Sequence, residues 1–298
     1  MNNSQIFFEL PRISAALLHE PWMILPSIHR SLIDQVSSFI ESRSHPAAAG
    51  KNAIFEEPPL PPGAINRLTT YDKASGLAVI NARGVIGKGL STLAMNCGGL
   101  CVDQIEQSLE QLRSKNPKAV AIHINSPGGT VNGTEECGHA LRAFSAEVAP
   151  VHAFSDTMCA SAAYWLAASC DTLHVAPSAY VGSIGVYSYL VDDSAAWAAE
   201  GRRMILVASG PQKAAGFPGT VVTDEQVAEL RATVGRMAKR FESYVLSRRP
   251  GIDANSAFSG AAWAAQDAPA GVHDGYLRSR SDHLAFVLAS AGRYKRAA

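Results

Sequence analysis

The sequence predicts an α/β fold, because short apolar segments of strand length alternate with amphipathic segments of helix length. The candidate strands are residues 77–81, 119–124, 151–154 and 172–175. The candidate helices between them are residues 102–112, 131–144 and 161–168. In the first of these helices Val102, Ile105 and Leu109 recur at helical spacing and form one apolar face. This alternation predicts βαβ units whose helices cover a sheet.

The second half of the chain continues the pattern. Residues 186–190 and 203–207 are further candidate strands, and residues 194–200 between them form a candidate helix. Thr223 and Gln226 have the spacing of a capping box and open a long amphipathic helix that ends before Pro250. Residues 258–276 then predict a turn, a helix and a short strand.

A proline-rich stretch divides the chain near residue 64. Residues 44–65 predict a linker, because four of the five positions from Pro58 to Pro62 are proline and cannot join a helix or a central strand. Residues 6–43 are mostly helical in pattern, with breaks at Pro21 and Pro26. We therefore expect an N-terminal helical extension and linker (1–63), a main domain (64–280) and a C-terminal helical tail (281–298).

Charge and hydropathy exclude several classes of protein. Lys and Arg together number 26, as do Asp and Glu, so the formal net charge is zero, which argues against a nucleic-acid-binding protein. The N-terminus lacks the basic region of a secretory signal, and no apolar run approaches the roughly 18 residues of a membrane span. We expect a cytoplasmic protein without a membrane anchor.

The cysteines predict neither a disulfide framework nor a metal site. Their number, five, is odd, and the chain is not small. Cys97 and Cys101 have a loosely metal-like spacing, but no nearby His or Cys pair completes a tetrahedral site. Cys159 lies two residues before Ser161 among apolar neighbours, so core packing is its better interpretation. We expect reduced thiols, no metal and no cofactor.

Two short segments carry the candidate chemistry. Ser161 begins an alanine-rich helical pattern, and Lys213 lies in a loop of small residues with no acidic residue within ten positions. A serine hydroxyl is a poor nucleophile until a base takes its proton, and a desolvated neutral lysine can be that base. Upstream, residues 125–129 (Asn-Ser-Pro-Gly-Gly) form a strand-end turn that can aim backbone N–H groups at an oxyanion. Together they suggest a serine–lysine peptidase.

Four motifs in this order resemble those of the S49 peptidases, over roughly residues 75 to 278. The motifs are residues 125–129, 160–165, 181–186 and 210–216. That family contains bacterial signal peptide peptidases and phage head-maturation proteases, and residues 10–13, 21–26 and 84–87 look more like the phage branch. The resemblance implies a ClpP/crotonase-like fold of repeated ββα units with an N-terminal helical extension. It also implies a ring-shaped homo-oligomer and a dyad that can be completed across subunits.

The resemblance assigns roles to five positions. Ser161 would be the nucleophile and Lys213 the general base, in a dry setting supplied by flanking residues such as Pro211 and Phe217. The backbone N–H groups of Gly129 and Ala162 would form the oxyanion hole. Ser183 could orient the amine of Lys213, or could simply be a turn residue.

Histidine-based catalysis is the alternative mechanism. The ClpP branch shares the turn at residues 125–129 but needs a histidine within residues 181–186, and this chain has none there. His123, His152 and His174 occur in strand-like runs, where we expect structural roles.

The leading functional hypothesis is an endopeptidase of phage or prophage head assembly. Its partners would be extended peptide or protein substrates, including phage scaffold, portal and capsid proteins. Three alternatives stay open: a cytosolic signal-peptide-peptidase-like enzyme that degrades peptides, a non-catalytic capsid scaffold, and a crotonase-like acyl-CoA enzyme.

Overall fold

A computed structural model describes residues 21–43, 63–96 and 98–291. The chain forms two compact units. The larger unit consists of residues 23–28, 53–185 and 240–298, and the smaller unit consists of residues 1–22, 29–52 and 186–239. Each unit is described by itself below.

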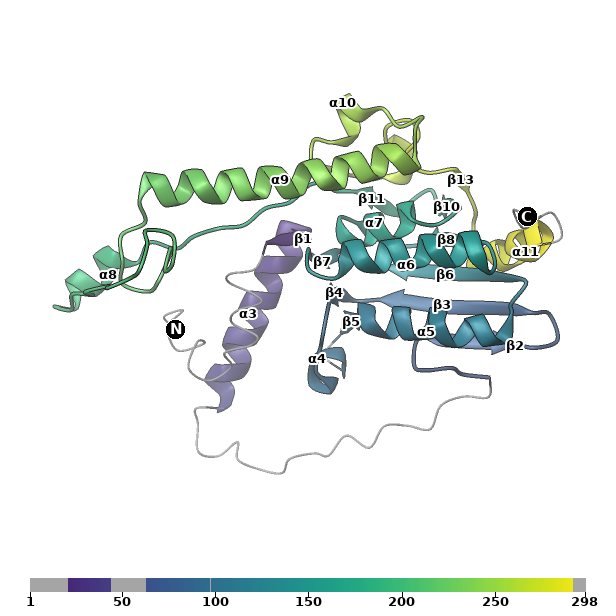
Figure 1. The fold of residues 1–298 in the computed structure, drawn as a ribbon, viewed down its shortest axis with the longest axis horizontal. Coiled ribbons are helices and arrows are strands. Elements are labelled where there is room, and N and C mark those ends of the chain that lie inside the picture. The colour runs from purple at the N-terminus through teal and green to yellow at the C-terminus, as the bar shows by residue number, and fades with distance from the viewer. Residues whose placement is uncertain (1–20, 44–62, 97, 292–298) are drawn as a thin grey trace. The chain divides into compact units, whose positions relative to one another are not determined.

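The larger unit is built on a six-stranded sheet (Figure 1). Its strand order is β13-β10-β8-β6-β3-β2, and only β2 runs antiparallel to its neighbour. The strands are β2 (Thr69–Asp72), β3 (Leu77–Arg83), β6 (Ala119–Asn125), β8 (Val151–Ser155), β10 (Thr172–Val175) and β13 (Gly275–Tyr276). All residues of β6 except Asn125 are buried, as expected for a central parallel strand covered on both faces.

Each of the central strands is followed by a short second strand that leaves the large sheet. The short strands are β4 (Val85–Gly87), β7 (Gly128–Thr130), β9 (Met158–Ala160) and β11 (Tyr180–Gly182). They join two small sheets, with orders β1-β7-β4-β5 and β12-β11-β9. The remaining members are β1 (Trp22–Ile24), β5 (Gly99–Cys101) and β12 (Ala262–Ala264). The expected repeated ββα units, and the α/β class, are therefore confirmed.

Helices cover both faces of the large sheet. The helices α5 (Val102–Lys115), α6 (Thr134–Glu147) and α7 (Ala162–Ala168) complete the ββα units and pack along one face (Figure 1). On the opposite face α11 (Arg280–Ala291) buries Val287 against Ala119 and Ala121 of β6. Three shorter helices, α4 (Thr92–Asn96), α10 (Ala254–Ala257) and η2 (Ala265–Asp267), lie in the connections.

The smaller unit contains most of α3 (Pro26–Arg43), α8 (Ser194–Ala199) and the first part of α9 (Asp224–Arg248), which continues into the larger unit. The expected capping box opens α9: the Thr223 N–H donates to Gln226 Oε1 at 3.1 Å, and the Gln226 N–H donates to Thr223 Oγ1 at 3.3 Å. These two bonds satisfy backbone donors that a helix N-terminus otherwise leaves without partners.

Most expected elements are confirmed within a few residues; the helix expected at 131–144 begins three residues later, at Thr134. The strands expected at residues 186–190 and 203–207 are wrong: the first has only an isolated bridge at Tyr187, and the second belongs to no strand. Both segments have strand-like composition, but a strand needs a partner to receive its ladder of hydrogen bonds. Trp22–Ile24 is a strand within the stretch that was expected to be mostly helical. The expected boundaries at 63 and 280 stay a prediction.

Candidate active site

Ser161 lies in the junction between β9 and α7. Its backbone has φ +57° and ψ −118°, which a side-chain-bearing residue rarely adopts. These angles are close to the first central position of a type II′ turn, about +60° and −120°, where glycine is usual. A serine held in a sharp turn between strand and helix is the arrangement by which nucleophile elbows expose a hydroxyl. Backbone strain of this kind is concentrated at functional sites.

Hydrogen bonds on both sides hold this turn. The Ser161 N–H donates to Gly182 O at 2.8 Å, and the Trp165 N–H donates to Ser161 O at 3.1 Å. The residue is 1% exposed. The turn is therefore fixed by the end of β11 and by the first turn of α7.

The glycine-rich turn runs beside the same junction. Ser126 forms a parallel bridge with Cys159, so that the Ala160 N–H donates to Ser126 O at 3.2 Å. Strand β7, which contains Gly129, packs against α7, which begins at Ala162. A Cβ atom on Gly129 would lie 2.0 Å from Ile86 O, so a side chain here would displace the backbone of β4. Three of the five expected site residues are thus brought to one junction.

Ser183 follows β11 directly and comes to the same region, because Gly182 is the residue that accepts the Ser161 N–H. Ser183 is 6% exposed and has φ +52°. Its N–H donates to Ala261 O at 2.6 Å, which holds this turn against the segment before β12.

Lys213 lies in the smaller unit and is exposed, as are Pro211 and Phe217. The dry surroundings expected from these neighbours are therefore not formed in this structure. The backbone of the loop is nevertheless ordered: the Lys213 N–H donates to Gly210 O at 3.1 Å.

Gln226 is a residue that sequence reasoning assigned only to helix capping. Its Nε2 donates to Pro211 O at 2.9 Å, while its Oε1 serves the capping box. One side chain thus ties the lysine loop to the first turn of α9. The capping-box pattern predicts the contact of Gln226 with Thr223. No local pattern predicts its contact with Pro211, which is 15 residues away in the sequence.

Cys159 is fully buried, and this desolvation raises the pKa of its thiol to about 12. A thiol that stays protonated is a poor nucleophile, so Cys159 is a packing residue, as expected. Cys97 lies outside the described residues, and the Cys101 Sγ donates to Asp103 Oδ2 at 3.1 Å.

The three histidines expected to be structural lie on the sheet face that α11 covers. His123 Nε2 lies 3.2 Å from Nδ1 of His283, and His152 Nε2 lies 3.0 Å from Oγ of Ser290. His283 and Ser290 belong to α11. The His174 ring lies against Phe286 of the same helix, with centroids 4.4 Å apart. Desolvation by burial lowers the pKa of His123 to about 4, which favours a neutral core residue.

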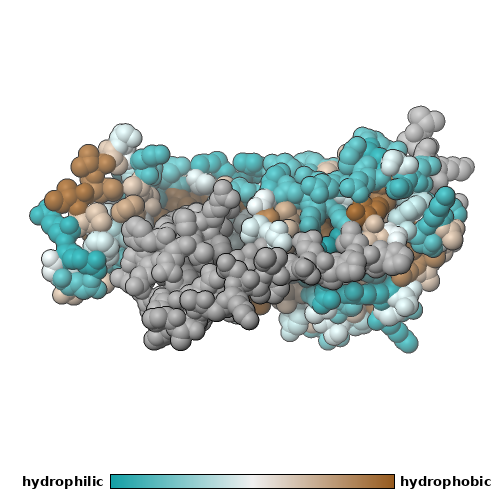
Figure 2. All heavy atoms as spheres, turned by 90° about the horizontal axis from the view of Figure 1, so that it is seen from below, coloured by the Kyte–Doolittle hydropathy of each residue, from teal (hydrophilic) through white to brown (hydrophobic). Residues whose placement is uncertain are grey.

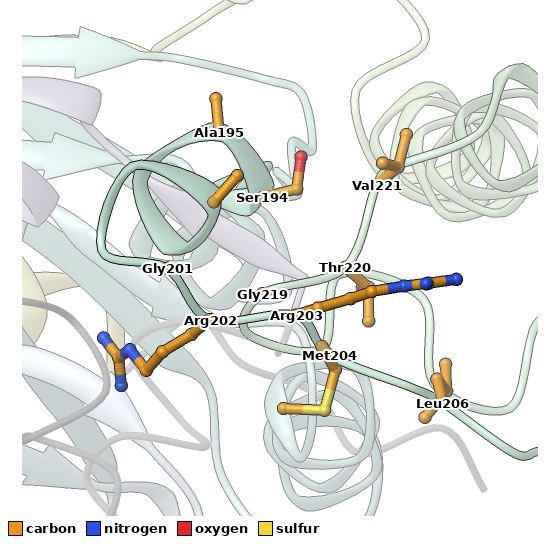
Figure 3. A pocket seen from close by; sticks show the side chains of 11 residues that line it. Ser194, Ala195, Gly201, Arg202, Arg203, Met204, Leu206, Gly219, Thr220 and Val221 are labelled. Carbon is orange, nitrogen blue, oxygen red and sulfur yellow. The ribbon is translucent and has the colours of Figure 1, made fainter.

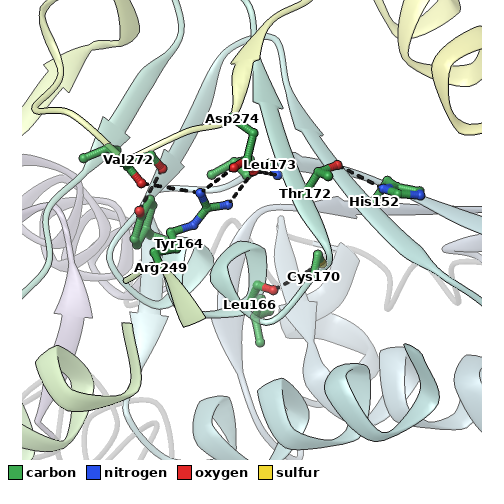
Figure 4. A network of polar contacts seen from close by, with 10 residues as sticks. His152, Tyr164, Leu166, Cys170, Thr172, Leu173, Arg249, Val272 and Asp274 are labelled. Carbon is green, nitrogen blue, oxygen red and sulfur yellow. Dashed lines mark hydrogen bonds and ion pairs between the residues drawn. The ribbon is translucent and has the colours of Figure 1, made fainter. Parts of the chain in front are cut away.

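A polar network connects α7 with the residues that follow α9 and precede β13 (Figure 4). Three residues after Ser161, Tyr164 donates from its hydroxyl to Val272 O at 2.8 Å. Nearby, Arg249 pairs with Asp274 at 3.0 Å, and Asp274 Oδ2 accepts the Leu173 N–H at 2.6 Å. Burial alone would raise the pKa of Asp274, but the Arg249 guanidinium holds it below its usual value. Asp274 thereby connects Arg249, the residue that follows α9, with Leu173 of β10.

Residues 143–272 match the model of peptidase family S49, so the expected resemblance to that family is confirmed. Protease 4 of Salmonella typhi is 34% identical over 122 residues, covering 41% of this chain and 19% of that protein. Capsid assembly protease C of Escherichia phage lambda is 24% identical over 245 residues, covering 79% of this chain and 55% of that protein. The chain thus spans between about a fifth and about half of the length of these relatives.

Two solved structures are similar to the chain at low sequence identity. An enoyl-CoA hydratase/isomerase family member has a TM-score of 0.44 and 14% identity, covering 76% of each chain. A ClpP1 variant from Listeria monocytogenes has a TM-score of 0.40 and 13% identity, covering 70% of this chain and 95% of that one. In the described residues, every helix is too short or too polar to span a membrane.

Proposed function

We propose that the chain is a serine endopeptidase in which Ser161 and Lys213 form a catalytic dyad. The observation that carries the proposal is the backbone of Ser161, which is held at φ +57° between β9 and α7 by two hydrogen bonds. An ordinary packing serine has no need of such a conformation. The match of residues 143–272 to peptidase family S49 gives the same reaction class.

In the proposed reaction Ser161 Oγ attacks the scissile carbonyl and passes its proton to the amine of Lys213. The N–H groups of Gly129 and Ala162 stabilise the resulting oxyanion. Collapse of this intermediate breaks the C–N bond, and the leaving amine takes the proton from Lys213. Water then attacks the acyl-enzyme by the same route and releases the second product. Ser183 would hold the lysine amine in position.

The exposure of Lys213 sets a condition on this mechanism. A lysine acts as a base only after it has lost its proton, and burial is the usual cause of that loss. We propose that a bound substrate or a neighbouring copy of the chain covers the lysine loop when the dyad is active.

The test compares casein digestion and intact mass for the wild type, Ser161→Ala and Lys213→Ala. Ser247→Ala and Lys239→Ala, both in exposed positions of α9, are the matched controls. We expect both dyad variants to lose digestion and any self-trimming, and both controls to keep them. Digestion that survives in Ser161→Ala would rule out the mechanism. Thioester turnover without peptide cleavage would instead favour the acyl-CoA alternative.

For the biological role we propose cleavage of proteins in a phage or prophage head under assembly. The lambda relative is named as a capsid assembly protease and aligns with 79% of this chain, which is more than the Protease 4 relative covers. Co-expression with the scaffold and capsid proteins of the same phage tests the role. Trimmed scaffold in the presence of wild type, and intact scaffold with Ser161→Ala, is the expected result. Trimming in neither case would favour the peptide-degrading alternative.

A further inference from the structure

Strand β7, which carries Gly129 of the proposed oxyanion hole, has both of its edges paired in this structure. On one side it pairs with β4, where Gly129 lies opposite Ile86, and on the other side it pairs with β1 (Figure 1). A polypeptide that adds to a sheet as a strand needs an edge whose N–H and C=O groups are free. A substrate strand can therefore pair with β7 only by taking the place of β4 or of β1.

Of these two neighbours, β1 is the one that can be exchanged. Strand β4 continues directly from β3 of the large sheet and pairs with β5 along three residues. Strand β1 is the terminal strand of its small sheet and lies outside the repeated ββα units. Removing β4 would disrupt the larger unit, whereas removing β1 takes away only an edge strand. The position that a substrate strand can occupy beside β7 is therefore the position of β1.

The backbone of β1 lies close to both parts of the proposed site. The Leu25 N–H donates to Pro127 O, just before β7, at 3.1 Å. A Cβ atom on Gly128 would lie 2.1 Å from Met23 O and 3.0 Å from Ala160 O. The glycine therefore lets the main chain of β1 approach the turn before Gly129 and the residue before Ser161. The proposed reaction requires a substrate backbone in the same place.

The side chains of β1 are apolar and enclosed. Trp22, Met23 and Ile24 are 3%, 1% and 2% exposed. Successive side chains of a strand point to opposite faces, so three enclosed side chains in a row show that both faces of this position are covered. The position therefore suits an extended apolar segment.

The first residue of β1 is held by few bonds. Trp22 belongs to the smaller unit, where it exchanges two backbone hydrogen bonds with Tyr187, at 2.8 and 3.0 Å, in an isolated bridge. The indole Nε1 of Trp22 is buried, and no described residue accepts its hydrogen. A buried donor without an acceptor costs free energy. A strand without such a donor can therefore compete with β1 for the position.

We infer that residues 22–24 occupy the substrate-strand position of the proposed peptidase, so that an extended apolar segment of a substrate polypeptide must displace them before it is cut. The inference rests on the proposed function. It adds the substrate class, an extended apolar segment, and a block of the site by the chain itself.

The smaller unit offers a competing surface for an apolar peptide. A cavity of about 760 Å³ is lined by Met204, Leu206 and Val221, among others (Figure 3). Figure 2 shows apolar surface, in brown, at the end of this unit that carries α8. None of the five candidate site residues lines this cavity. A peptide bound there would leave β1 in place, so the state of β1 distinguishes the two binding places.

The first test measures hydrogen exchange of β1 by mass spectrometry in Ser161→Ala, so that no probe is cut. The probe is a fluorescein-labelled peptide with the sequence of residues 19–27 and phenylalanine in the place of Trp22, which removes the indole N–H and gives its fragments a different mass. The N–H groups of Trp22 and Leu25 are hydrogen-bonded in β1 and should exchange slowly. We expect the probe to speed their exchange, and a scrambled peptide of the same composition to leave it unchanged.

The second test measures binding of the probe by fluorescence anisotropy in the same background. Ile24→Ala weakens β1, and Ile105→Ala, a buried isoleucine of α5, is the matched control. We expect Ile24→Ala to tighten binding about tenfold, the equivalent of about 1.4 kcal/mol, because apparent affinity rises with the fraction of chains whose site is open. Ile105→Ala and Leu206→Asp should change binding less than about twofold. In the active protein, Ile24→Ala should lower KM for casein and leave hydrolysis of a small ester unchanged.

Three results would overturn the inference: bound probe that leaves the exchange of β1 unchanged, binding that Ile24→Ala does not tighten, or binding that Leu206→Asp abolishes. If Ile24→Ala does not fold, the exchange of the unchanged strand decides. Displacement of β1 by the probe without cleavage of any protein would refute the peptidase proposal and leave the strand position standing. Casein digestion that Ile24→Ala does not alter and the probe does not inhibit would refute the strand position alone.

Discussion

Replacing Ser161 by glycine should give a more stable protein than replacing it by alanine, and should abolish the proposed peptidase activity. The residue has φ +57° and ψ −118°, where a Cβ atom is strained and glycine is not. Strain of this kind costs about 1–3 kcal/mol. Glycine loses more backbone entropy on folding than alanine, which costs roughly 0.5–1 kcal/mol. The difference leaves a net gain of about 1 kcal/mol for Ser161→Gly over Ser161→Ala.

Alanine is the correct reference, because both variants lack the hydroxyl and differ only in the Cβ atom. The measurement is urea unfolding of the two variants, with the free energy of unfolding extrapolated to water. Ala228→Gly, at an exposed position within α9, is the control and should lose about 1 kcal/mol. The sign of the change should therefore differ between the two sites. A loss at residue 161 equal to that at residue 228 would refute the strain argument.

Three further predictions follow from other parts of the larger unit and from the start of α9. Burial lowers the pKa of His123 to about 4 and of His283 to about 3, below the 6.5 of a free histidine. As the pH falls, the unfolded chain therefore binds protons at these histidines before the folded chain does. The free energy of unfolding should be highest above pH 6.5 and should fall toward pH 4 by about 1.4 kcal/mol per pH unit for each histidine. Urea unfolding at several pH values checks this. Arg249→Met should lower the free energy of unfolding by about 2 kcal/mol, measured by thermal unfolding. The loss is smaller than for a fully buried ion pair, because the Asp274 side chain is 40% exposed. Adding Asp274→Asn should recover part of the lost stability. Thr223→Ala should lower the free energy of unfolding by about 1 kcal/mol. It should also speed proteolysis of the lysine loop, because Gln226 of the same capping box bonds to that loop. Thr233→Ala, within α9, is the control and should not change the rate of proteolysis.

The elements of the larger unit could be predicted because their signals are local. The buried run of β6 and the helical spacing of Val102, Ile105 and Leu109 depend only on neighbours in the sequence. The capping box of α9 is likewise a contact between residues three positions apart. The candidate Ser161 could be named for the same reason, from its small neighbours and the helical pattern that follows it.

The sequence alone thus determined the α/β class and the candidate residues, because periodicity and motif order are properties of the chain itself, and the ββα order followed from the resemblance to the S49 peptidases. Only the tertiary structure decided that Ser161 is held in a strained turn, since that depends on Gly182 O, 21 residues further on. It also decided that Lys213 is exposed and that residues 203–207 form no strand, although their composition favours one. Burial and strand pairing depend on what the fold places beside a segment, and no local pattern contains that information.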